Sequence, residues 1–196
     1  MKLAHALDTF AIDVRGREAL DIGASTGGFT DVLLKRGATR VVALDVGYGQ
    51  LHPRLRADPR VTVLERTNAR TLTELPFAPR LGVCDVSFIS VRLALPPVLH
   101  LCAPGWQAIV LVKPQFEAGR ADVGKGGVVR DDEVRRRVVH EVAEAAPTWG
   151  ASVLGVVDSG LPGPKGNREI FLHLAHSEHA TLPDDLDERI EHALAG

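Results

Sequence analysis

Three charged side chains of this chain fall where predicted strands begin or end, and together they could do acid–base chemistry. Asp85 and Lys113 each close an apolar strand, and Glu169 opens the last strand. In an open α/β sheet, the carboxyl ends of the strands border the ligand crevice. A neutral lysine there could act as a general base, while the carboxylates could orient it or stabilise a cation. For each residue alone, the alternative is a solvated charge at a strand terminus.

A glycine-rich loop after the first predicted strand could hold a nucleoside-type cofactor. It runs from Gly23 to Gly28, where the glycines allow a sharp turn and a close approach to a ligand, and it opens a helix with free N–H groups. Asp45 ends the next strand, where an acidic residue can accept hydrogen bonds from both hydroxyls of a ribose. Ser25 replaces the second glycine of the dinucleotide-binding motif G-x-G-x-x-G. The alternative is an ordinary tight turn between a strand and a helix.

Seven short apolar runs, separated by helix-compatible stretches, would position these residues. The strand candidates are residues 19–22, 40–45, 61–64, 81–85, 108–113, 151–158 and 169–174, and the clearest helix candidates are 26–36, 91–102 and 131–146. Strands that alternate with helices predict a parallel sheet covered on both faces. The last two strands are joined by a Gly- and Pro-rich segment without a helix, which indicates an antiparallel hairpin. We therefore predict an α/β, Rossmann-like fold with a seven-stranded, mostly parallel sheet, an antiparallel last strand and helices on both faces.

Six motifs spread over nearly the whole chain are more specific than any single residue. They occupy residues 23–30, 65–70, 85–90, 111–117, 123–127 and 166–169. Together with the antiparallel last strand, they resemble the TlyA (haemolysin A-like) branch of the FtsJ-type methyltransferases, from about residue 2 to about residue 174. The resemblance implies a class I methyltransferase fold, S-adenosylmethionine as cofactor and 2′-O-methylation of ribose in ribosomal RNA. It also implies a catalytic tetrad of Lys2, Asp85, Lys113 and Glu169.

The same resemblance implies a cofactor site. The residues expected to bind S-adenosylmethionine follow the first four predicted strands: Gly23, Ala24, Ser25, Thr26, Gly27, Gly28, Asp45, Val46, Asn68, Asp85, Val86 and Ser87. The glycine loop would line the methionine part, Asp45 would bind the ribose and Asn68 the adenine. Methyl transfer from a sulfonium is an in-line displacement, so the enzyme mainly aligns donor and acceptor. Lys113 would take the proton of the attacking hydroxyl.

More than one methyl acceptor stays open at this point. The resemblance implies ribosomal RNA or a ribosomal subunit. A small molecule or natural product is the first alternative, and a non-catalytic RNA-binding or ribosome assembly factor is the second. The family usually carries a small RNA-binding domain ahead of the methyltransferase domain, and this chain begins where that domain would end. Residues 85–88 lack the two prolines of enzymes that methylate exocyclic amino groups, and neither Cys84 nor Cys102 follows a proline, as the nucleophile of cytosine C5 enzymes does.

The net charge of the 196-residue chain is −2, which alone would argue against a nucleic-acid binder. That sum hides an uneven distribution. Residues 177–196 hold six acidic residues and one basic residue, so residues 1–176 carry a charge of +3. We expect a methyltransferase domain over residues 1–176 and an acidic C-terminal tail with a short helix over residues 177–196. The charge objection to an RNA substrate is thereby removed.

Composition excludes several other classes of protein. Hydrophobic residues make up 45% and charged residues 24%, which is typical of a globular chain and not of a disordered one. Two cysteines are too few for a disulfide framework or a cysteine-based zinc site. No apolar run approaches the ~18 residues that a membrane span needs, and the start lacks a signal-peptide core. We expect a cytoplasmic protein with no metal ion and no membrane partner.

Overall fold

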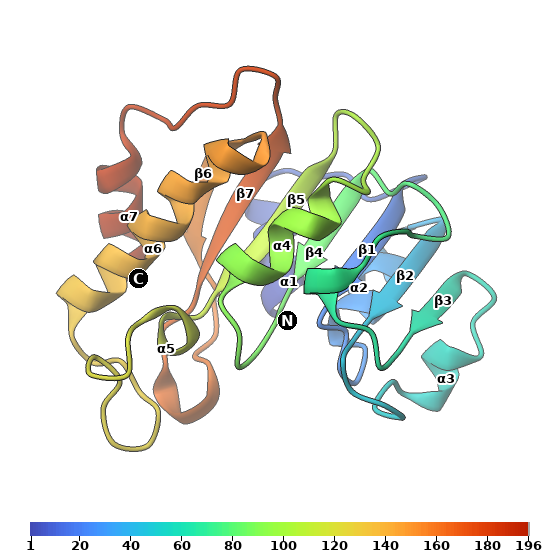
Figure 1. Ribbon diagram of the computed structural model, residues 1–196, viewed down its shortest axis with the longest axis horizontal. Helices are drawn as coiled ribbons and strands as arrows, with labels where there is room; N and C mark the ends of the chain where they lie inside the picture. The colour runs from blue at the N-terminus through green and yellow to red at the C-terminus, as the bar shows by residue number, and fades with distance from the viewer. Residues whose placement is uncertain (196) are drawn as a thin grey trace.

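One sheet of seven strands organises residues 1–195, the part of the chain that the computed structural model describes (Figure 1). The strands are β1 (Glu18–Ile22), β2 (Arg40–Leu44), β3 (Val61–Leu64), β4 (Leu81–Cys84), β5 (Gln107–Val112), β6 (Ala151–Asp158) and β7 (Ile170–His176). Their order in the sheet is β3-β2-β1-β4-β5-β7-β6. The first five strands pair in parallel, and β7 runs antiparallel to both β5 and β6. The predicted fold class is confirmed.

Helices cover both faces of this sheet (Figure 1). They are α1 (Lys2–Thr9), α2 (Gly28–Lys35), α3 (Pro53–Arg56), α4 (Val91–Leu99), α5 (Pro114–Glu117), α6 (Asp132–Ala145) and α7 (Leu186–Ala195), with 3-10 turns η1 (Ala69–Thr71), η2 (Ala146–Trp149) and η3 (Pro164–Gly166). Strand residues alternate between two cores: Leu20 packs with α4, α6 and α7, whereas Ala19 packs with α1 and α2. Burial on both faces explains why residues 41–44 of β2 and 108–112 of β5 are apolar at every position.

Several element boundaries differ from the prediction. Strands β2, β4 and β5 end one residue earlier than expected, so Asp45, Asp85 and Lys113 belong to the loops that follow them. Glu169 does not open the last strand, which begins at Ile170. Helix α2 begins at Gly28 instead of residue 26, because Gly27 has a left-handed backbone (φ +97°) that ends the preceding turn. The charged side chains therefore belong to the loops at the edge of the sheet and not to the hydrogen-bonded strands.

The C-terminal helix α7 packs on the same core as the helices before it. Leu186, Ile190 and Leu194 are buried among residues of β6 and α6. Arg136 of α6 pairs with Glu191 of α7, and His140 of α6 lies 3.1 Å from a carboxylate oxygen of Asp187. Two acidic residues of the tail therefore face basic groups of α6.

A membrane-crossing helix would need a long apolar stretch. Within residues 1–195, none of the helices combines the required length and hydropathy.

Candidate active site

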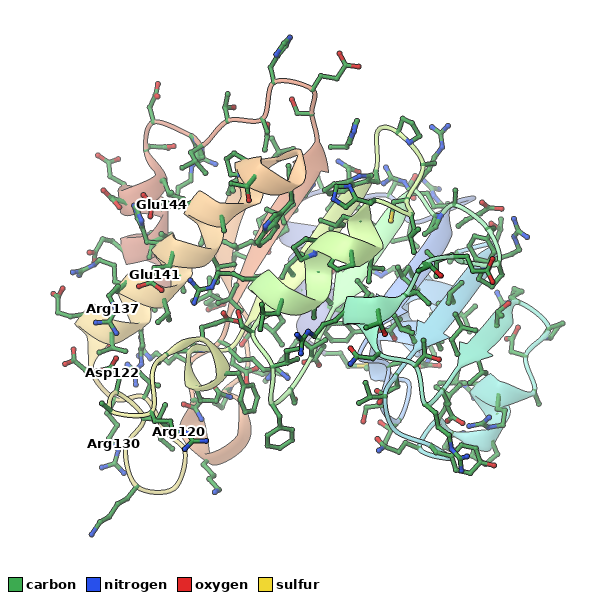
Figure 2. The ribbon with its side chains drawn as sticks, viewed as in Figure 1. Arg120, Asp122, Arg130, Arg137, Glu141 and Glu144 are labelled. Carbon is green, nitrogen blue, oxygen red and sulfur yellow. The ribbon has the colours of Figure 1, made fainter. Side chains whose placement is uncertain are left out.

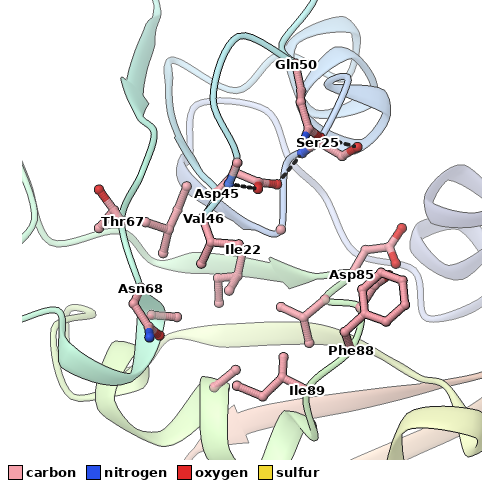
Figure 3. Close-up of a pocket in the computed structure, with 17 residues that line it drawn as sticks. Ile22, Ser25, Asp45, Val46, Gln50, Thr67, Asn68, Asp85, Phe88 and Ile89 are labelled. Atoms are coloured by element: carbon pink, nitrogen blue, oxygen red, sulfur yellow. Dashed lines mark hydrogen bonds between the residues drawn. The ribbon is translucent and has the colours of Figure 1, made fainter.

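A cavity of about 320 Å³ opens at the carboxyl edge of β1, β2 and β4 (Figure 3). Its walls are the loops that follow these strands, the segment between β3 and η1, and the first turn of α4. The residues that line it are Ile22, Gly23, Ser25, Leu44, Asp45, Val46, Gly47, Gln50, Thr67, Asn68, Ala69, Asp85, Val86, Ser87, Phe88, Ile89 and Ala94. Most of the wall is apolar, with a few polar groups from separate loops. Such a composition is typical of a cofactor pocket.

Gly23 keeps the loops after β1 and β4 in close contact. Its φ is +86°, and a Cβ there would lie 2.6 Å from the carbonyl oxygen of Asp85. A larger residue would therefore have both a strained backbone and a steric clash. This close approach brings the glycine loop and the Asp85 loop together as one wall of the cavity.

Asp45 is fixed by the backbone of two loops. Its Oδ2 accepts a 2.7 Å hydrogen bond from the N–H of Ser25, and its Oδ1 accepts one of 2.7 Å from Gly47 (Figure 3). An ionised carboxylate has about four acceptor positions, so two bonds leave room for hydroxyl donors of a ligand. Across the cavity, Asn68 caps the η1 turn through a 3.0 Å bond from Arg70 N–H to its Oδ1. The polar side chains of Asp45 and Asn68 thus stand on separate loops.

The predicted cofactor residues divide into two groups. Eight of them line the cavity: Gly23, Ser25, Asp45, Val46, Asn68, Asp85, Val86 and Ser87. Ala24 is buried in the core below α2, Thr26 is exposed, and Gly27 lies against Leu51 and Leu55. Gly28 also stands outside the cavity lining, since it begins α2.

Sequence reasoning missed several lining residues. Gln50 lines the cavity with its Oε1 3.4 Å from the hydroxyl of Ser25. Thr67 precedes Asn68 in the motif of residues 65–70. Phe88 and Ile89 belong to the 85–90 motif, whose apolar side chains carried no chemical signal of their own. The motifs could have identified these residues, but residue chemistry alone could not.

The four predicted catalytic residues form two ion pairs. Lys2 Nζ lies 2.5 Å from Glu169 Oε2, and the Glu169 side chain is fully buried. Lys113 pairs with Asp85 Oδ1, and its Nζ also donates a 3.0 Å bond to Ser87 Oγ. Only 10% of the Lys113 side chain is exposed, so its ammonium has little access to water beyond these partners.

Different elements deliver the four side chains. Lys113 follows β5 directly, and Asp85 follows the neighbouring strand β4. Lys2 stands on α1, whose buried Leu3 and Leu7 dock it on the sheet. Together these elements bring residues from the two ends of the chain to one sheet edge.

A second cavity of about 310 Å³ adjoins Lys113. It is lined by Ser87, Phe88, Lys113, Gln115, Phe116, Gly126, Gly127, Lys165, Asn167 and Glu169. Ser87 and Phe88 line both cavities, so the cavities adjoin at the loop after β4, where Ser87 accepts the bond from Lys113. Gln115, two residues after Lys113, donates a 3.3 Å bond from its amide to Glu169 Oε1.

Two buried groups near the first cavity have pKa values far above their usual range. Burial raises the pKa of Asp21 to about 7, although the Thr30 hydroxyl donates a 2.7 Å bond to its Oδ2. Burial also raises the pKa of the Cys84 thiol to about 12. A thiol with that pKa stays protonated at neutral pH and is a poor nucleophile. Cys84 is therefore unsuited to the covalent chemistry of cytosine C5 enzymes.

No cluster of three or more metal-ligating His, Cys, Asp or Glu side chains occurs among residues 1–195. His173 is buried beside Phe10 and Gln107. Burial lowers its pKa to about 4, so it is neutral at physiological pH.

The family of the chain follows from a comparison with known proteins. A family model described as FtsJ-like methyltransferase matches residues 1–176. The chain belongs to this family. It is 51% identical over 197 residues to the 16S/23S rRNA (cytidine-2′-O)-methyltransferase TlyA of Mycobacterium tuberculosis strain H37Rv, covering 99% of this chain and 74% of that protein.

Solved structures agree with the family assignment. A protein of Lactococcus lactis described as a candidate hemolysin superposes with a TM-score of 0.93 at 40% identity, covering 99% of this chain and 93% of that one. An S-adenosylmethionine dependent methyltransferase of Mesorhizobium loti superposes with a TM-score of 0.67 at 16% identity, covering 90% of this chain and 98% of that one. The last likeness shows the Rossmann-like methyltransferase fold.

The first cavity fits the cofactor of this family, S-adenosylmethionine. Gly23 lets the loops after β1 and β4 approach closely enough to form one wall of the cavity. Asp45 offers acceptors for ribose hydroxyls, and Asn68 stands on the opposite wall. When bound, the cofactor supplies a methyl group already activated on a sulfonium.

Proposed function

We propose that this protein transfers a methyl group from S-adenosylmethionine to the 2′-hydroxyl of a ribose in ribosomal RNA. One observation carries the proposal: the cofactor cavity and a second cavity meet beside Lys113, with Ser87 and Phe88 lining both. An acceptor hydroxyl at that junction would lie between the methyl donor and a buried amine. This arrangement serves in-line transfer, which depends chiefly on alignment.

In this proposal Lys113 is the general base and acts as a neutral amine. Its partners Asp85 and Ser87 fix the position of Nζ. The second pair, Lys2 and Glu169, borders the acceptor cavity through Glu169, which also accepts a bond from Gln115. Glu169 would orient Lys2, and the two carboxylates would balance the positive charge of the lysines and of the cofactor.

An RNA acceptor is supported by aromatic and basic side chains around the two cavities. Phe88 is 91% exposed, and its ring lies 5.1 Å from that of Phe116. Exposed rings next to a reaction centre can stack an unpaired base. Beside the cofactor cavity, the guanidinium of Arg66 lies 4.1 Å from the exposed ring of Tyr48, a second surface suited to a base or a phosphate.

The relatives support ribosomal RNA as the specific partner. The Mycobacterium tuberculosis relative is named for methylation of cytidine 2′-hydroxyls in ribosomal RNA. We propose the same substrate class for this chain, as free RNA or within a ribosomal subunit. A cytoplasmic location follows from that partner.

A labelled methyl group tests the proposal. We expect label from S-adenosylmethionine to pass to ribosomal subunits that lack the modification, and not to a panel of small metabolites. Salt-sensitive binding to the RNA should accompany the transfer, because phosphate contacts release counterions. Label on a metabolite, with none on RNA, would replace this proposal with the small-molecule alternative. Binding without any transfer would favour an assembly factor.

A further inference from the structure

The carboxylate of Glu117 lies buried between two loops, and the proposed reaction does not use it. Its Oε2 accepts a 2.5 Å bond from the Ser90 hydroxyl, and its Oε1 accepts a 2.8 Å bond from the N–H of Val91. Only 1% of the Glu117 side chain is exposed. A buried carboxylate is costly unless it is hydrogen-bonded, so these two bonds hold it in place.

The two loops that Glu117 joins carry the reacting groups. One follows β4 and holds Asp85, Ser87 and Phe88. The other follows β5 and consists of Lys113 and the four-residue helix α5, which carries Phe116 and Glu117. The two loops contact each other at successive positions along their length. At the strand ends Lys113 meets Asp85 and Ser87, and farther along the Phe88 ring packs on Phe116.

Glu117 forms the last contact of that series. It bonds to Ser90 and Val91 where the first loop ends and α4 begins. The backbone of Phe88 inside this span has a φ of +64°, a conformation that a bulky residue adopts only when its surroundings enforce it. Contacts at both ends of the loop supply that restraint.

The groups around Glu117 act on its charge as well as on its position. The pKa of Glu117 is raised, because burial outweighs the bonds from Ser90 and Val91 and the guanidinium of Arg92, which lower it. Arg92 Nε lies 3.6 Å from Glu117 Oε2, and the same guanidinium reaches Glu141 on α6 at 3.3 Å. Figure 2 shows Glu141 on α6 next to Arg137.

We propose that Glu117 is a positioning residue that fixes the register of the two loops and thereby places Lys113 against Asp85 and Ser87. The inference rests on the proposed function, because the consequence of the register is methyl transfer by Lys113. Glu117 itself touches neither cavity.

Enzyme kinetics on the full chain test this role. Glu117→Ala should lower kcat by about 10- to 100-fold, because a displacement of about 1 Å can cost on the order of 100-fold. The KM for S-adenosylmethionine should change less than kcat, since the loop after β4 forms only part of the cofactor cavity and Asp45 and Asn68 stand on other loops. Glu117→Gln should recover most of the activity, because its amide can accept from Val91 and donate to Ser90.

Glu141, a partly exposed carboxylate that also pairs with Arg92, provides a matched control. Glu141→Gln removes the other acidic partner of Arg92 without touching either loop, and its activity should equal that of the wild type. Loss of activity in Glu141→Gln equal to that in Glu117→Ala would assign the effect to Arg92 and overturn the proposal.

A readout without turnover keeps this inference separate from the proposed function. Hydrogen exchange at the Val91 amide and in residues 86–92 should quicken by about tenfold in Glu117→Ala, and not in Glu117→Gln. Unchanged exchange would show that Glu117 does not hold the two loops together, even if methyl transfer is established. Faster exchange with an unchanged kcat would overturn the positioning role. If the wild type transfers no methyl group, the proposed function fails, while exchange still decides whether Glu117 joins the loops.

Discussion

At the scale of single residues, the environment of Lys113 decides what the site can do. The amine is nine-tenths buried, paired with Asp85, and bonded to Ser87 at the junction of two cavities. A general base must be within hydrogen-bond reach of the proton it takes, and this junction offers that reach.

Replacing Lys113 tests its role. We expect Lys113→Ala to abolish methyl transfer, with a loss of at least about 100-fold, and to leave the affinity for S-adenosylmethionine within a few-fold of the wild type. Transfer assays and calorimetric titration measure the two quantities. The exposed Lys35, paired only with Asp31 on α2, provides the matched control Lys35→Ala, which should keep full activity. Near-normal turnover of Lys113→Ala would remove this residue from the mechanism.

Asp21 gives a prediction about pH and stability. Its pKa is about 7 in the folded chain and near 3.8 when unfolded, so between pH 4 and 7 the unfolded state releases the proton first. Stability from this residue is therefore greatest near pH 4 and declines as the pH rises to 7, by on the order of 4 kcal/mol, and is level above that. Asp21→Asn should lack this slope.

Denaturant titrations of both proteins at pH 4 to 8 measure the difference. Because all other titrating groups are shared, the free energy of unfolding of the wild type minus that of Asp21→Asn isolates residue 21. A difference that stays constant across this range would show that Asp21 has an ordinary pKa in the folded chain.

At the scale of elements, α1 matters because it carries Lys2 to Glu169. The helix docks through Leu3, Ala6 and Leu7, and a further contact joins His5 to Asp158 at 3.3 Å. Lys2 and Glu169 are 167 residues apart in the chain, so their pairing depends on this docking. Packing of an apolar helix face thus supports a polar contact in the site.

Leu3→Ala should destabilise the fold by about 2–5 kcal/mol, since the side chain is fully buried. It should also lower methyl transfer, because Lys2 is adjacent. Leu93 on α4 is 53% exposed and offers the same substitution as a control, for which we expect a change of about 0.5 kcal/mol or less. Equal losses for the two variants, measured by denaturant unfolding, would mean that α1 is not docked as described.

Element patterns were predictable from the sequence, but contacts between elements were not. Alternating apolar runs and the Gly- and Pro-rich segment before Glu169 predicted the sheet and its antiparallel strand, because burial and turn chemistry are local signals. The motifs located Gly23, Asp45 and Asn68 at the cavity. Ala24, by contrast, is buried instead of facing the cavity, because the side-chain direction depends on how the loop turns.

At the scale of the whole molecule, the acidic tail is part of the packed structure. Ile190 is fully buried and Leu194 nearly so, in the core shared with α6 and β6. Each such side chain contributes about 1.5–3 kcal/mol when buried. The tail thus combines apolar packing with acidic groups that pair with Arg136 and His140.

Deletion of residues 177–196 should therefore lower the free energy of unfolding by several kcal/mol and expose apolar surface on α6. Thermal or denaturant unfolding of the shortened chain measures this loss, and dye binding reports the exposed surface. A shortened chain as stable as the full one would show that α7 does not pack on the core in solution.

The position of the transferred methyl group on RNA tests the central claim most directly. After reaction with labelled S-adenosylmethionine, ribosomal RNA is hydrolysed with alkali, which cannot cleave next to a methylated 2′-oxygen. We predict that the label remains in alkali-resistant dinucleotides, and that Lys113→Ala leaves none there. Label released in mononucleotides would place the methyl group on a base and contradict 2′-O-methylation by this site.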